Sequence, residues 1–100
     1  MPLARAASSH KEIAMKPLFI PLKTEWFRAF ERGDKKTEFR LYGPRWNEGT
    51  VIKGRAVTLS HGYSGARITA TVKRMRIVAN TITDIYPAGA LLCAIDLSGL

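Results

Sequence analysis

The chain has little sulfur, few histidines and no long apolar run. Its single cysteine, Cys93, excludes an intrachain disulfide and any metal site built from several cysteines. Only His10 and His61 could add ring nitrogens, so we expect no metal site. No stretch is apolar enough for a membrane span, and residues 1–14 lack the apolar segment of a secretory signal. We therefore expect a soluble, cytoplasmic protein with no membrane partner.

Acidic residues are also scarce, which leaves a large basic excess. Sixteen Lys and Arg stand against eight Asp and Glu, a net charge of +8. Polyanions are the natural partners of such a surface, and nucleic acid is the commonest of them. Two alternatives stay open: charge that serves solubility alone, and a basic protein–protein adaptor. No glycine-rich segment matches a dinucleotide or phosphate-loop fingerprint, so we expect no cofactor.

The length of the chain, 100 residues, and its hydrophobic content of 46% fit one small domain with a modest core. Residues 1–14 are rich in Ala and Ser and show no sustained period. They are predicted to form a disordered tail, with the folded domain at residues 15–100. Met15 is a second candidate for the start of translation. We expect a monomer.

Alternating apolar and polar residues predict five or six short strands. A helix is expected from Thr24, as its cap, to about Arg32, with Gly33 as its stop. This order predicts a mainly β (α+β) fold, a small β-barrel with one or two short helices. The five clearest strand candidates are residues 16–22, 36–42, 55–60, 67–78 and 91–97.

Two irregularities are expected within these strands. Pro17 and Pro21 cannot donate backbone hydrogen bonds, so the first strand should lie at an edge or meet a bulge. In the fourth strand the apolar positions change phase near residues 73–74, which is typical of a β-bulge. Cys93 lies in an apolar run, and we expect a buried, inert thiol.

The segment at residues 33–40 contains the charged residues that are the main candidates for a functional site. Glu38 and Arg40 are two residues apart and therefore share one strand face, with Lys35 at the start of the strand. On a solvated face the pair would be an ordinary exposed ion pair. In a cleft, Arg40 would donate two hydrogen bonds to a phosphate or a base edge. Glu38 would orient Arg40 or accept a hydrogen bond from an amine. The spacing leaves both interpretations open.

The pattern G-x-K-x-x-E-x-R, read as Gly33, Lys35, Glu38 and Arg40, resembles the signature of ASCH domains, relatives of the PUA RNA-binding barrel. The resemblance covers residues 16–97. An aromatic helix precedes the pattern, and a tryptophan loop, a basic-glycine turn and a final Ile-Tyr-Pro segment follow it. The resemblance implies a PUA-like barrel that binds RNA or a nucleotide in a cleft between barrel and helix.

One branch of that family, the small bacterial amidohydrolases, acts on N4-acetylcytidine through a proposed lysine, threonine and glutamate. Lys35 matches the lysine, whereas Glu38 occupies the threonine position. The chain is too short for the helical insertion that carries the family's glutamate. If the protein is an enzyme, Lys35 and Glu38 are the catalytic candidates, and a weak ribonuclease is a further alternative.

Other residues are candidates for the ligand surface, and each has an alternative interpretation. Arg45 and Arg67 are candidate phosphate contacts, as are Arg74 and Arg76, and each is otherwise a solvated charge. Trp46 and Tyr86 are candidates to stack on a base or, alternatively, to pack on the barrel rim. A catalytic Ser60–His61 pair is a minor alternative, because no acid lies nearby in the sequence to orient the histidine.

Overall fold

The computed structural model describes residues 15–81 and 83–100, so the tail predicted at residues 1–14 lies outside the described part. Within these described ranges, one helix and five strands follow one another. No helix in the described ranges is long and apolar enough to span a membrane. The elements are β1 (Leu18–Leu22), α2 (Thr24–Arg32), β2 (Thr37–Leu41), β3 (Ala56–His61), β4 (Arg67–Ala79) and β5 (Leu91–Ser98).

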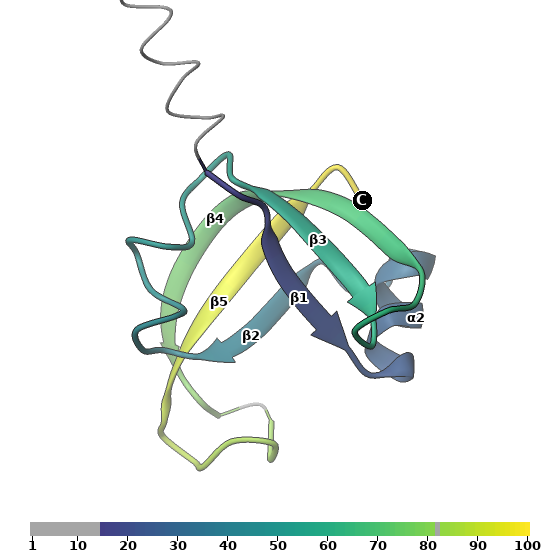
Figure 1. Ribbon diagram of the computed structural model, residues 1–100. Coiled ribbons are helices and arrows are strands. Elements are labelled where there is room, and N and C mark those ends of the chain that lie inside the picture. The colour runs from purple at the N-terminus through teal and green to yellow at the C-terminus, as the bar shows by residue number, and fades with distance from the viewer. Residues whose placement is uncertain (1–14, 82) are drawn as a thin grey trace, which may run out of the picture.

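The five strands form one sheet in the order β1-β3-β4-β5-β2. β1 pairs in parallel with β3, and the other neighbours are antiparallel. The sheet curls into a half-barrel, with β1 in front of β5 and β2 and with α2 at one end (Figure 1). The edge strands are β1 and β2. The prediction of a mainly β fold, a small β-barrel of five or six strands with one or two short helices, is confirmed, with five strands and one helix in the described residues.

Both predicted irregularities are present. β1, which contains Pro21, is an edge strand, so the missing proline donor costs no ladder bond. The register of β4 against β5 shifts between Val72 and Arg74, which is the predicted bulge. The change of apolar phase in the sequence therefore located this bulge correctly.

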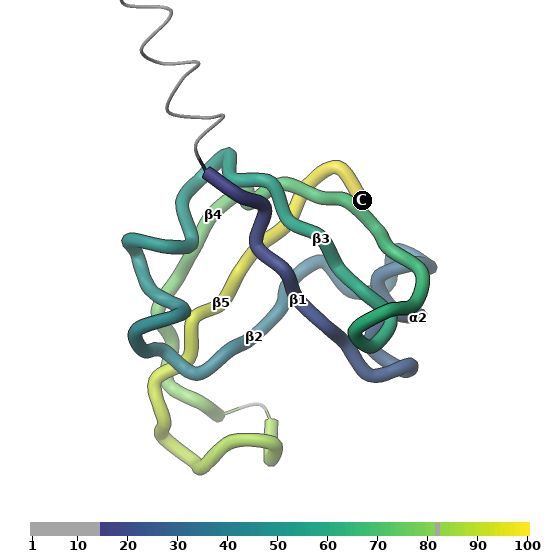
Figure 2. Tube along the Cα trace, in the orientation of Figure 1, coloured from purple at the N-terminus to yellow at the C-terminus, as the bar shows by residue number. Residues whose placement is uncertain are grey.

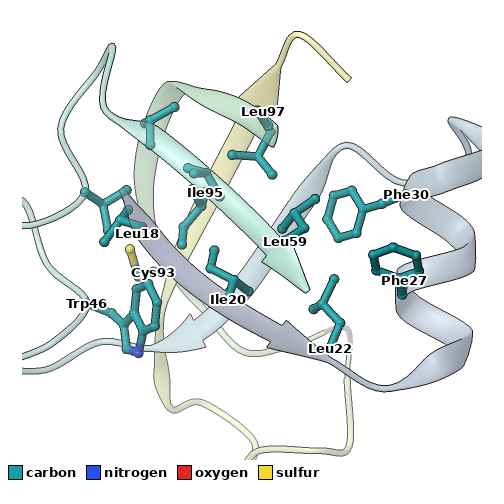
Figure 3. Close-up of a cluster of buried hydrophobic side chains, with 14 residues drawn as sticks. Leu18, Ile20, Leu22, Phe27, Phe30, Trp46, Leu59, Cys93, Ile95 and Leu97 are labelled. Atoms are coloured by element: carbon teal, nitrogen blue, oxygen red, sulfur yellow. The ribbon is translucent and has the colours of Figure 1, made fainter. Parts of the chain in front are cut away.

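Alternate residues of the strands point into the concave side and form the core. Phe27 and Phe30 of α2 cover one end of it, while Trp46 and Cys93 lie toward the other (Figure 3). Cys93 has no exposed surface, and burial raises the pKa of its thiol to about 11. The prediction of a buried, unreactive cysteine is thus supported.

The ends of α2 differ in how well the sequence predicted them. Gly33 ends the helix in the left-handed conformation, with a φ of 84°, as expected. Thr24, however, is the first helical residue and not the cap, because Lys23 holds the N-cap position without a side-chain hydrogen bond. The hydroxyl of Thr24 instead pairs with Nε2 of His61 at 2.8 Å. That contact fixes the start of α2 to the end of β3.

Candidate functional site

A pocket of about 550 Å³ opens on the side of the half-barrel where β1 and β2 are not paired with each other. This volume lies within the range of small-molecule sites. Four segments line it: the end of β1, the helix α2, strand β2 with the residues before it, and the β4–β5 loop. The lining residues are Pro21, Leu22, Lys23, Trp26, Lys35, Glu38, Phe39, Arg40, Thr83, Asp84, Ile85 and Tyr86.

Register explains why a charged pair faces the inside of the sheet. Glu38 lies opposite Ile95 and Arg40 lies opposite Cys93, and directly opposed side chains share one face. Both β5 partners belong to the core. The polar face of β2 therefore points inward, at the one margin where the curled sheet leaves the interior open.

Lys35, Glu38 and Arg40 converge in this pocket. Arg40 Nε donates to Glu38 Oε2 at 3.0 Å, and Lys35 Nζ lies 3.7 Å from Glu38 Oε1. The Glu38 side chain is only 11% exposed, so this is not the solvated pair considered from the sequence. Each carboxylate oxygen faces one cation, which holds both cations at the pocket wall.

Arg40 also links the two edge strands. Its Nη2 donates to the backbone carbonyl of Pro21 in β1 at 2.9 Å, so a side chain spans the gap that no ladder closes. A guanidinium has five N–H donors. Two are used in these contacts to Glu38 and Pro21, which leaves donors for a ligand.

Lys35 sits among aromatic rings. Its Nζ lies 5.3 Å from the ring centroids of Trp26 and Phe30 and 5.6 Å from that of Phe39. Ring faces attract a cation at these distances, as does the Glu38 carboxylate. These contacts hold the Lys35 side chain at the pocket wall, where its charge can attract an anion.

The β4–β5 loop, which lies below the sheet in Figure 2, contributes Thr83, Asp84, Ile85 and Tyr86 to the pocket lining. A single buried side chain, Asn80, organises it. The Asn80 amide donates to the carbonyls of Thr83, Tyr86 and Pro87 at 2.8, 2.8 and 3.1 Å, and its oxygen accepts from the Thr83 N–H. Asn80 thus positions Tyr86 although it does not itself line the pocket.

Replacing Asn80 with alanine is expected to lower ligand affinity about tenfold, because the wall loses the amide that holds three carbonyls. Calorimetric titration measures the affinity of the variant, and thermal unfolding measures its stability separately. Asn47→Ala is the matched control, since Asn47 similarly holds Gly43 and Pro44 in a loop that does not line the pocket. Equal affinity losses in the two variants would contradict a positioning role for Asn80.

The other predicted ligand residues are scattered. Tyr86 lines the pocket with the three charged residues. Trp46 is 9% exposed and packs in the core, with the guanidinium carbons of Arg40 and Arg45 5.4 and 5.3 Å from its ring centroid. Arg45 does not line the pocket, and Arg67 lies over Phe19 on another face. For Trp46 the packing alternative describes what the structure shows.

Arg74 and Arg76 do not form a free basic stripe. Asp96 of β5 accepts hydrogen bonds from Arg74 Nε, Arg76 Nε and Arg76 Nη2 at 2.9 to 3.0 Å. Asp96 also accepts from the Thr37 hydroxyl of β2 at 2.7 Å. One carboxylate therefore joins three neighbouring strands beside the bulge, which explains both arginines as structural partners.

The Ser60–His61 alternative is not supported by geometry. His61 stacks on Phe27 at 5.2 Å between ring centroids and pairs with Thr24, while the buried Ser60 hydroxyl has no hydrogen-bond partner among the described residues. No three His, Cys, Asp or Glu side chains within residues 15–81 and 83–100 are grouped to hold a metal ion.

The sequence patterns do not identify Trp26 as part of the pocket, nor do they identify three further contributors. Lys23 adds a cation to the pocket, Asn80 builds its wall, and Asp96 joins the strands that carry it. For Asp96 a signal was present: a lone carboxylate within an otherwise apolar strand requires partners. Lys23 and Asn80 stand at element ends, where only the three-dimensional arrangement shows what they face.

The chain was compared with models of known families and with curated proteins. Neither comparison found a match. The resemblance to ASCH domains therefore stays a prediction that rests on Gly33, Lys35, Glu38 and Arg40 and their context, and the pocket geometry carries the functional argument.

Proposed function

We propose that this protein binds RNA or a nucleotide-type ligand in the pocket between β1, α2, β2 and the β4–β5 loop. The observation that carries the proposal is the convergence of Lys35, Glu38 and Arg40 with Trp26 and Tyr86 in one concavity. Cations with unused donors suit a phosphate, and aromatic walls suit the flat face of a base. The net charge of +8 adds long-range attraction for a polyanion.

The proposal agrees with what the ASCH resemblance implies. We propose a binding module that acts as a monomer, since one chain supplies all four walls of the pocket. We propose the cytoplasm as the place where it acts. Glu38 serves in it as the anchor of two cations. Three basic side chains line the pocket (Lys23, Lys35 and Arg40) against the two acids Glu38 and Asp84, so a positive excess remains for an anionic ligand.

A titration across salt concentrations tests the proposal. The affinity for a single-stranded RNA should fall linearly on a log–log plot against salt, as phosphate contacts release counterions. Lys35→Ala should lower affinity about tenfold and flatten that slope, because one phosphate-facing cation is lost. The control is Lys53→Ala, which removes the same charge from an exposed turn outside the pocket.

Two outcomes would contradict the proposal. Binding that does not depend on salt would favour the protein–protein adaptor, as would equal behaviour of the Lys35 and Lys53 variants.

The enzyme alternative is tested by incubating the protein at high concentration with N4-acetylcytidine. We expect no deacetylation, because Glu38 and three rings surround the Lys35 ammonium. Turnover that disappears in Lys35→Ala would establish the amidohydrolase instead.

A further inference from the structure

The β3–β4 turn displays an aromatic side chain that no packing requirement explains. Tyr63 is 79% exposed, whereas the core aromatics Phe27 and Phe30 are nearly inaccessible. Its ring centroid lies 6.3 Å from that of Phe19, which points outward from β1 because Leu18 and Ile20 point inward. Two rings from separate elements thus adjoin on one outer surface.

Arg67 completes this surface as a third planar group. Its guanidinium carbon lies 5.1 Å from the Phe19 ring centroid, and Nε and Nη2 donate to the carbonyls of Gly65 and Tyr63 at 3.3 and 3.2 Å. No acidic side chain is paired with Arg67 in the described part of the chain. Its positive charge is therefore left uncompensated beside two aromatic rings.

The turn that carries Tyr63 is tightly constrained. Gly62 adopts a φ of 69°, and a Cβ on Gly65 would stand 2.4 Å from the His61 carbonyl oxygen. The His61 N–H donates to Ala66 at 2.9 Å, and the Gly65 N–H donates to His61 at 3.1 Å. A rigid turn loses little entropy when a flat ligand settles on the ring that it presents.

The turn adjoins the pocket across the end of β1. The Gly62 N–H donates to the carbonyl of Leu22 at 2.9 Å, and Leu22 and Lys23 both line the pocket. Figure 2 shows the β3–β4 turn beside the end of β1 and the start of α2. The turn that presents Tyr63 is thus hydrogen-bonded to a residue of the pocket lining.

We propose that Tyr63, Phe19 and Arg67 form a second subsite, which stacks a base of a single-stranded RNA whose adjoining nucleotide occupies the pocket. This inference rests on the proposed function and narrows it, because it makes the preferred ligand a polynucleotide and not a free nucleotide. Aromatic rings stack on every base, and an unpaired arginine attracts the phosphate beside it, so the subsite needs no particular sequence.

The test compares a short and a long ligand. Uridine 5′-monophosphate is titrated calorimetrically, and a labelled oligouridylate of about eight nucleotides is titrated by fluorescence anisotropy. Tyr63→Ala should weaken oligouridylate binding about five- to tenfold and leave monophosphate binding unchanged, whereas Lys35→Ala should weaken both. Tyr63→Phe keeps the ring and should behave as wild type. Ser64→Ala changes the same turn without removing a ring and is the control.

The outcomes separate the two proposals. Oligouridylate binding that is unchanged in Tyr63→Ala, or weakened equally in Ser64→Ala, overturns the second subsite and leaves the pocket proposal standing. Equal losses for both ligands in Tyr63→Ala also overturn it, since the effect would then act on the pocket itself. A wild-type protein that binds neither ligand overturns the proposed function and the subsite together.

Discussion

Replacing Arg40 with alanine is expected to lower affinity for RNA or nucleotides at least about 20-fold, the largest loss from any single pocket residue. Arg40 is the group with the most donors to offer, and it is held at Glu38 and at the Pro21 carbonyl. Its loss also removes the bridge between the two edge strands and leaves Glu38 with one cation. A decrease of about 1 to 2 kcal/mol in unfolding free energy should accompany the weaker binding.

Arg45→Ala is the matched control for this prediction. Arg45 flanks the same Trp46 ring at nearly the same distance as Arg40 but does not line the pocket. Arg45→Ala removes one positive charge, as Arg40→Ala does. It should reduce affinity less than threefold, roughly the effect of losing an exposed charge. Arg40→Lys keeps the charge but lacks the planar guanidinium, so its affinity should lie between those of wild type and Arg40→Ala. Equal losses in Arg40→Ala and Arg45→Ala would show that overall charge, and not the pocket, governs binding.

The fold was largely predictable because its signals are local. Alternation in each strand, the prolines of the first strand and the phase change near residues 73–74 all act through neighbouring residues. The prediction of Thr24 as the cap of α2 was wrong because a residue distant in the sequence determines what Thr24 contacts. Thr24 forms its hydrogen bond with His61, 37 residues away, and sequence patterns do not report such a contact.

The candidate site was predictable only where one strand carries it. Glu38 and Arg40 share a face because they occupy alternate positions of β2, and Lys35, which precedes the strand, reaches Glu38 from outside it. Whether that face meets solvent or a cleft depends on the pairing of β2 with β5 and on the unpaired margin toward β1, which are long-range facts. Arg45 and Arg67 are predicted from charge alone, and charge does not specify that both lie outside the pocket.

The two buried carboxylates of the sheet serve opposite faces. Glu38 holds its cations on the concave side, where a ligand can reach them, while Asp96 lies one position further along the ladder and faces outward. Thr37 and Asp96 are directly opposed, as are Asp96 and Arg74, so the outward row crosses three strands. Ionic and hydrogen-bond contacts on both faces of β2 therefore hold in place the strand that carries Glu38 and Arg40.

Asp96→Asn is expected to lower the free energy of unfolding by about 2 to 3 kcal/mol at pH 7, or roughly 10 to 20 °C in Tm for a chain of this size. The amide cannot accept from Thr37, Arg74 and Arg76 together as the carboxylate does. The cost stays below that of a fully buried pair because the two arginines remain accessible to water. Urea unfolding followed by tryptophan fluorescence measures the difference.

The pH dependence of that difference distinguishes charge from packing. The hydrogen bond from Arg76, with those from Thr37 and Arg74, holds the pKa of the Asp96 carboxyl well below its usual range. The folded-state pKa thus lies below the unfolded one, so the stabilisation is complete above about pH 4 and disappears as the pH falls toward the folded-state pKa. Wild type and Asp96→Asn should differ by a constant amount from pH 5 to 8. Below about pH 4 the difference should shrink steadily, and it should vanish only near the folded-state pKa.

Asp34→Asn provides the contrast that makes the result specific. Arg32 and Asp34 form a pair of the same 2.9 Å length, but both side chains are more than half exposed. Its loss should change stability by less than about 0.5 kcal/mol at any pH, because water and salt screen an exposed pair. If Asp96→Asn were no more harmful than Asp34→Asn, or if its cost did not shrink as the pH falls from about 4 to about 2, the carboxylate would not be what holds β2, β4 and β5 in register.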